Sequence, residues 1–227
     1  MYIMLTQNQA QSFAHEFQTS SDNVIKEHYQ LYILDLLCNS AWEDKLVFKG
    51  GTALRLAYGS VRFSEDLDFS LTEGVDFEDF RKTIGRIESV HPEAKVIDIF
   101  NKRYIFYARV LFTIKFRSIP MGIKIEVSKV PRVFQSDIKL FRSPFNNLEV
   151  LGKVYTLESI LADKLRILDN NERREPRDLF DAWFISDKLG LPFIVKEEYK
   201  YDHKVLMDRL NAFLPQKYHK VIELFSL

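Results

Sequence analysis

The chain has 227 residues, with 32 Lys and Arg and 32 Asp and Glu side chains, so its formal net charge is zero. It therefore lacks the overall basic field that drives non-specific nucleic-acid binding, and a nucleic-acid partner would need a local basic patch. Because 46% of its residues are hydrophobic, the chain can bury a large core without disulfides, and its single cysteine, Cys38, fits a reducing cytoplasm.

The first part of the chain predicts two helices, over residues 7–17 and 23–38, which we expect to support a sheet. The second helix has apolar positions at helical spacing and Asp22 as its expected N-cap. No apolar run approaches the length of a membrane span, and no signal-peptide pattern opens the sequence. These features favour a cytoplasmic protein that does not enter a membrane.

The stretch from Lys49 to Leu71 is the one around which we expect the fold to be organised. An apolar run enters the turn Gly50-Gly51, and Thr52 opens a short helical pattern. Free backbone N–H groups at a helix start attract phosphate oxygens, and glycine allows a close approach. Gly50, Gly51 and Thr52 therefore predict a phosphate cradle.

The next strand carries two carboxylates on one face. Asp66 and Asp68 alternate with Leu67 and Phe69, and a period of two places the aspartates about 6–7 Å apart. Like charges so close repel each other, and a divalent cation such as Mg²⁺, which prefers oxygen ligands, removes that penalty. The alternative is an ordinary Gly-Gly turn followed by an exposed strand face.

The middle of the chain predicts a helix and then three strands. The helix is expected over residues 76–90, and the strands over residues 95–100, 104–116 and 122–130, the second of them as a long central strand. In the third strand Glu126 lies on a polar face between apolar neighbours. A lone glutamate on a strand usually faces solvent, but its place after the two aspartates favours a functional role.

The last part of the chain predicts a loop and then helices. We expect a loop over residues 131–147, with a boundary between a core of residues 1–147 and a helical domain of residues 148–227. Helices are predicted at 157–168, after Thr156, and from Pro176 to about Gly190, and the tail at 196–227 predicts one or two more, broken by Pro215.

Four segments together resemble a known family. They are FKGGTAL, RFSEDLDF, LESILADKLRIL and EPRDLFDAW, and they are similar to the AbiEii/AbiGii nucleotidyltransferase toxins of bacterial abortive-infection and toxin-antitoxin systems. That family is part of the polymerase-beta-like nucleotidyltransferase superfamily. The resemblance implies an α/β fold, in which a core with a mixed sheet and flanking helices precedes a helical C-terminal half.

The resemblance also implies roles for individual residues. Asp66 and Asp68 would hold Mg²⁺ or Mn²⁺, and Glu126 would be the third carboxylate, a metal ligand or base, where the family pattern has aspartate. Lys164 would clamp the triphosphate of a nucleoside triphosphate, although on spacing alone it is a solvated helix residue. Further candidates are Asp178 for catalysis and Lys49, Arg62, Ser64, Arg177 and Asp181 for nucleotide binding.

The implied activity is transfer of a nucleoside monophosphate from a nucleoside triphosphate to an RNA acceptor, with the tRNA 3′ end as a candidate and a cognate antitoxin as partner. Two alternatives are a catalytically silent nucleotide- or antitoxin-binding module and a metal-dependent nuclease. Cations that could build a basic patch for RNA are Lys102, Arg103, Lys115, Arg117, Arg132, Lys139, Arg142, Arg166, Arg173, Arg174 and Arg177.

Overall fold

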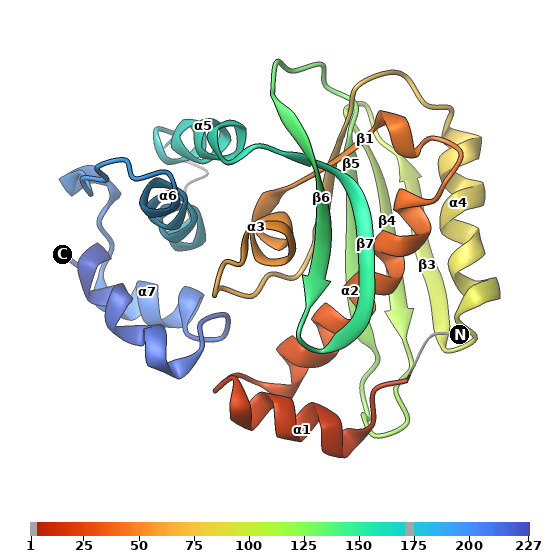
Figure 1. Cartoon of the computed structure of the whole chain (residues 1–227), viewed down its shortest axis with the longest axis horizontal. Helices are drawn as coiled ribbons and strands as arrows, with labels where there is room; N and C mark the ends of the chain where they lie inside the picture. Colours follow the sequence, from red (N-terminus) through yellow and green to blue (C-terminus); the bar gives the residue numbers. More distant parts are fainter. Residues whose placement is uncertain (1–3, 171–174) are drawn as a thin grey trace.

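A computed structural model describes residues 4–170 and 175–227, so Arg173 and Arg174 of the predicted basic cluster lie outside the described residues. Within them the chain forms one mixed sheet with helices around it (Figure 1). The strands are β1 (Leu46–Lys49), β2 (Leu67–Leu71), β3 (Ala94–Asn101), β4 (Ile105–Phe112), β5 (Met121–Ser128), β6 (Ser136–Ser143) and β7 (Asn146–Tyr155). The helices are α1 (Gln7–Glu16), α2 (Ser21–Cys38), α3 (Gly50–Tyr58), α4 (Phe77–Val90), α5 (Leu157–Leu168), α6 (Pro176–Lys188) and α7 (His203–Leu210), and the 3-10 turns are η1 (Glu43–Lys45), η2 (Glu197–Tyr199) and η3 (Gln216–Phe225).

The strand order in the seven-stranded sheet of the described residues is β3-β4-β5-β2-β1-β7-β6, so β2 lies at its centre. The pairs β2–β5 and β1–β7 are parallel and the other neighbours are antiparallel. The predicted α/β fold with a helical C-terminal half is confirmed. The segment predicted as the central strand is instead β4, next to an edge, because its composition reports how it packs and not where it pairs.

Helices α2 and α4 pack side by side on one face of the sheet. Tyr29 of α2 stacks on Phe112 of β4, and Phe80 of α4 stacks on Phe106 of the same strand. All four side chains are buried in the main hydrophobic core. Aromatic pairs of this kind bury a large apolar area, so they fix both helices to this face. The N-cap of α2 is Ser20, and not Asp22 as predicted, because the helix begins at Ser21, two residues earlier than predicted.

The helices α5, α6 and α7 form a layer of their own, at the left of Figure 1. Their apolar side chains surround Phe180 and Ile185 in a second core, which also includes Val47 of β1 and Leu54 of α3. The C-terminal half is thereby attached to the two elements that flank the Gly-Gly turn. Thr156 caps α5 by accepting a hydrogen bond from the backbone of Ser159, as predicted.

The loop predicted over residues 131–147 is wrong for most of its length. Residues 136–143 form β6, an edge strand that pairs with β7, and Pro144 lies in the tight connection between the two strands. Ile138 and Leu140 are exposed on this edge, which obscures the alternation expected of a strand. The domain boundary expected after residue 147 falls inside β7, which leaves the sheet only at Tyr155.

No helix of the described part of the chain is long and apolar enough to cross a membrane.

Candidate active site

The register of the three central strands brings Asp68 and Glu126 together. Asp68 of β2 is paired with Lys49 of β1 on one side and with Glu126 of β5 on the other. Paired residues on neighbouring strands point to the same face of the sheet and lie about 5 Å apart. Two carboxylates and one ammonium group therefore stand in a row at the centre of the sheet.

The pKa of Asp68 is raised by its surroundings. Burial and the nearby charges of Asp66 and Glu126 raise the pKa of Asp68 to about 6. Lys49 and Lys164 act in the opposite direction but do not outweigh them. Burial also raises the pKa of Asp66. A further cation beside Asp68, in addition to Lys49 and Lys164, would lower the free-energy cost of ionising this carboxyl group at neutral pH.

The donor set fits a hard divalent cation in its chemistry. Asp66, Asp68 and Glu126 offer only carboxylate oxygens, the ligands that Mg²⁺ and Mn²⁺ prefer. Among residues 4–170 and 175–227, however, no three acidic, His or Cys side chains converge with the geometry of a metal site. Asp66 instead lies 4.0 Å from the ammonium group of Lys124. The metal site therefore stays a prediction.

The Gly-Gly turn fixes the start of α3 beside Asp68. Gly50 has φ +80°, and a Cβ on it would lie 2.7 Å from Oδ2 of Asp68, so both its backbone conformation and the space require glycine. At Gly51 a Cβ would collide with the side chains of Arg62 and Ser64. Thr52 is buried and donates a hydrogen bond of 2.5 Å to the carbonyl oxygen of Asp66. The first turn of α3 thus holds the start of β2.

Gly50 and Gly51 were expected to leave room for a phosphate, but the structure gives another reason for glycine at these positions. The places that side chains would take are filled by Asp68, Arg62 and Ser64 of the protein itself. The start of α3 carries no side-chain cap, and a helix N-terminus attracts anions through its backbone N–H groups. A phosphate cradle at the backbone N–H groups of this helix start, next to the carboxylate pair, therefore stays a prediction.

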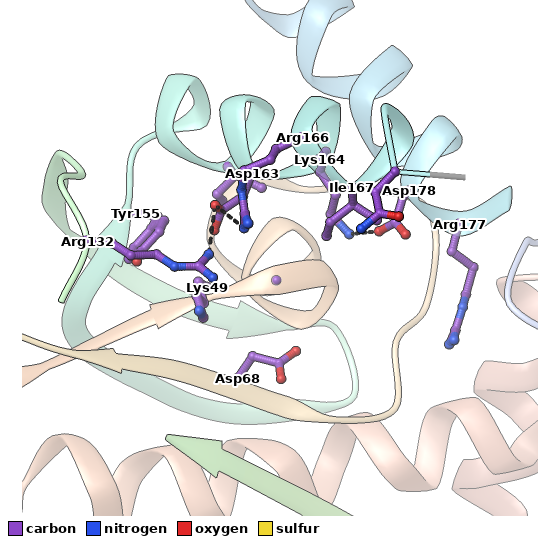
Figure 2. Close-up of a pocket in the computed structure, with 13 residues that line it drawn as sticks. Lys49, Asp68, Arg132, Tyr155, Asp163, Lys164, Arg166, Ile167, Arg177 and Asp178 are labelled. Carbon is purple, nitrogen blue, oxygen red and sulfur yellow. Dashed lines mark hydrogen bonds and ion pairs between the residues drawn. The ribbon is translucent and has the colours of Figure 1, made fainter. Parts of the chain in front are cut away.

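A cleft of about 530 Å³ opens over these residues. Figure 2 shows Lys49 and Asp68 on its sheet side and Asp163, Lys164 and Arg166 of α5 across from them. Cations come from both halves of the chain, and the lining set is Lys49, Arg132, Lys164, Arg166 and Arg177, against the acids Asp68, Asp163 and Asp178. The excess of positive charge suits an anionic ligand.

Lys164 faces the cleft but is engaged by carboxylates of α6. Its ammonium nitrogen lies 2.6 Å from Asp178 and 2.7 Å from Asp181. Burial alone would lower the pKa of Lys164, but Asp181 and Asp178 outweigh it and raise the pKa. The lysine is therefore charged and held in one position.

Several of the predicted site residues do not line the cleft. They are Gly51, Thr52, Arg62, Ser64 and Asp181 of the nucleotide-binding set, and the carboxylates Asp66 and Glu126. Arg62 donates two hydrogen bonds of 2.8 Å to Asp181, and both side chains are buried. Arg177 does line the cleft, and its guanidinium lies 3.9 Å from Glu65. Ser64 lies against Gly51, as described above.

The sequence predictions missed Tyr155 and Asp163 as lining residues. Asp163 lies 3.1 Å from Arg132 and 3.2 Å from Arg166, and so holds both cations on one wall (Figure 2). Tyr155 donates a hydrogen bond to Ser70 and lies below the ammonium group of Lys49. A faint signal existed for Asp163, which is adjacent to Lys164, but none marked Tyr155 at the end of β7.

Comparison with solved structures shows a shared fold. JHP933 from Helicobacter pylori is 21% identical with a TM-score of 0.58, covering 90% of this chain and 95% of its own. MenT4, a nucleotidyltransferase toxin from Mycobacterium tuberculosis H37Rv, is 18% identical with a TM-score of 0.65, covering 98% of this chain and 89% of its own. A search of curated protein sequences gives no match.

A match to a family model extends this comparison from the fold to the family. The family model described as nucleotidyl transferase AbiEii toxin, type IV TA system, matches residues 32–220. The chain therefore belongs to the AbiEii family of nucleotidyltransferase toxins, and the predicted resemblance is confirmed. Membership implies a nucleoside triphosphate as substrate and a toxin-antitoxin context.

Proposed function

We propose that this protein transfers a nucleoside monophosphate from a nucleoside triphosphate to an RNA acceptor in a reaction that needs Mg²⁺ or Mn²⁺. The tRNA 3′ end is the candidate acceptor. The observation that supports the proposal most directly is the Asp68–Glu126 pair beside the start of α3, with Asp68 lining a cleft rich in cations.

The triphosphate would lie between the two halves of the chain. Lys49 and the first turn of α3 would contact it from the sheet side, and Lys164 and Arg166 from α5. Each charge-assisted contact to phosphate is worth roughly 1.5–3 kcal/mol. Lys164 would exchange one of its carboxylate partners for a phosphate oxygen, while Asp181 keeps its two bonds to Arg62.

The carboxylates would divide the remaining work. Asp66, Asp68 and Glu126 would hold the divalent cation, whose role when bound is to neutralise the charge that develops on the triphosphate. Glu126 would also orient or deprotonate the acceptor hydroxyl. Asp178 would position Lys164, which it contacts at 2.6 Å.

Transfer and its alternatives give different products in one experiment. The protein is incubated with total RNA, Mg²⁺ and each of the four α-labelled nucleoside triphosphates in turn, with Asp68→Asn as the inactive control. RNA that carries the label and is longer by one or more nucleotides supports the proposal. Shortened, unlabelled RNA identifies a nuclease, and triphosphate binding without any product identifies a silent module.

The setting of the activity is part of the proposal. The family supports a toxin that is opposed by a cognate antitoxin, and an RNA substrate places the reaction in the bacterial cytoplasm. Expression of the wild type should arrest growth, whereas Asp68→Asn should not. Growth arrest by both proteins to the same degree would show that toxicity does not depend on nucleotide transfer.

A further inference from the structure

One row of paired residues runs from the carboxylates to the edge of the sheet. Glu126 of β5 is paired with Tyr107 of β4, and Tyr107 with Phe100 of β3. On its other side Glu126 is paired with Asp68. Strands lie 4.7–4.9 Å apart, so Tyr107 is about 5 Å and Phe100 about 10 Å from Glu126 along the row. Aromatic residues thus continue the line of the active site.

This face of β3, β4 and β5 is open. Helices α2 and α4, which pack on these strands in the described part of the chain, contact the opposite face, through Phe106 and Phe112. Phe100 is 48% exposed, and its ring stacks on Tyr107 with centroids 6.0 Å apart and an angle of 20°. Tyr104, in the β3–β4 turn, is 56% exposed. Exposed aromatic groups gathered in one place indicate a binding surface.

Cations surround the aromatic pair. The ammonium group of Lys102 lies 4.7 Å from the ring centre of Tyr107, and Arg103 lies over Tyr104. Arg109 is exposed on β4 and makes no hydrogen bond or ion pair within residues 4–170 and 175–227. Lys124 of β5 is beside it in the register. In a chain of zero net charge, these cations form a local basic patch. The acids beside it are Asp98, opposite Arg109, Glu126 in the row itself, and Asp66, which lies 4.0 Å from Lys124.

We propose that this face holds the single-stranded end of the nucleic-acid acceptor. Bases stack on Tyr107 and Phe100, and Lys102, Arg109 and Lys124 contact the phosphates. Stacking on aromatic side chains between cations is how proteins bind single strands without reading their sequence. The distance of about 10 Å allows the terminal hydroxyl to reach Glu126 while the preceding one or two nucleotides lie on the aromatic rings.

That the end of the RNA points to Glu126 rests on the proposed function, but RNA binding to this surface can be tested separately. A fluorescent single-stranded oligoribonucleotide is titrated with the wild type and with Phe100→Ala, Tyr107→Ala and Lys102→Ala, and anisotropy is measured at several salt concentrations. Controls are Ile138→Ala on β6, at the opposite edge of the sheet, and Arg81→Ala on α4, which packs on the other face and where Arg81 pairs with Glu78. Nucleotide transfer and the KM for the triphosphate are measured in parallel.

Each aromatic substitution should weaken RNA binding about 10-fold, and Lys102→Ala should lower the salt slope by about 0.7. The KM for the triphosphate and the behaviour of both controls should stay unchanged. Variants that bind RNA like the wild type overturn the proposal. If the wild type binds RNA through this face but transfers nothing, the proposed function fails and the surface stands.

Discussion

Arg62 and Asp181 form a buried, two-bond ion pair although 119 residues separate them in the chain. Arg62 precedes β2, and Asp181 lies on α6. The same carboxylate contacts Lys164 at 2.7 Å. The pair therefore joins the sheet side of the cleft to its helical side, and Arg62 and Asp181 support the walls from beneath.

Asp181→Asn should strongly destabilise the protein. It removes one charge of a buried pair and leaves Arg62 uncompensated, which costs about 3–5 kcal/mol. Urea unfolding measures the change in the free energy of unfolding. The control is Arg142→Ala, which breaks the exposed pair with Glu149 and should cost at most about 1 kcal/mol. Equal, small effects of both substitutions would show that the buried pair does not hold the halves together.

Asp68→Asn should stabilise the metal-free protein at pH 8 and not at pH 4. The pKa of Asp68 is raised to about 6 from 3.8, so between these values the folded state binds the proton more tightly than the unfolded state. The stability of the wild type therefore falls as pH rises through this window. The amide has no such loss, and its advantage at pH 8 is at most about 3 kcal/mol.

Thermal unfolding in a chelator, from pH 4 to pH 8, measures this difference. Adding Mg²⁺ at pH 8 should raise the Tm of the wild type and leave that of Asp68→Asn nearly unchanged, because a ligand that binds only the folded state stabilises it. A stability difference that does not depend on pH would contradict the raised pKa. An equal response to Mg²⁺ in both proteins would move the metal site away from Asp68.

Lys164→Ala should raise the KM for the triphosphate, or lower kcat/KM, by about one to two orders of magnitude, because one charge-assisted phosphate contact is lost. The matched control is Lys153→Ala on β7, whose ammonium group contacts the carbonyl oxygen of Asp44 away from the cleft. Kinetics are compared well below the Tm of each variant, since Lys164 also pairs with buried Asp181. Indistinguishable kinetics of the two variants would show that Lys164 does not contact the triphosphate.

Glu126→Gln should lower kcat by at least 100-fold and change the KM for the triphosphate little. The amide keeps the shape of the side chain, but it cannot act as a base and is a poorer metal ligand. Steady-state kinetics, with the nucleoside triphosphate that gives transfer in the labelling experiment, separate kcat from KM. Near-normal turnover would show that Glu126 has no role in the chemical step and is an ordinary residue of the strand face.

The local part of the site could be predicted from the sequence. The order of Gly50-Gly51, Asp66 and Asp68 is set by one turn and one alternating strand, and such patterns are visible in a single segment. Glu126 followed from alternation in the same way. Its pairing with Asp68, by contrast, depends on which strands are neighbours, and the prediction of β4 as the central strand shows that composition does not contain this information.

Of the opposite wall only Lys164 was predicted, from the resemblance, since the rest depends on how α5 packs against α6 and β7. The contacts of Asp163 with Arg132 and Arg166 join α5 to the loop between β5 and β6, and no spacing in the sequence marks them. The β6–β7 hairpin was misread because Pro144 and the Asn146-Asn147 pair are turn formers. They belong to a short connection, whereas the prediction extended them over a whole loop.

The two walls of the cleft leave the ribosome at different times. Asp68 and Glu126 are synthesised before Lys164 of α5, and Asp178 of α6 follows later still. A nascent chain that has folded its sheet therefore carries the carboxylate row without the cations of α5. Catalytic competence should appear only near the end of translation, so fragments released early by stalled ribosomes would be harmless to the cell that makes them.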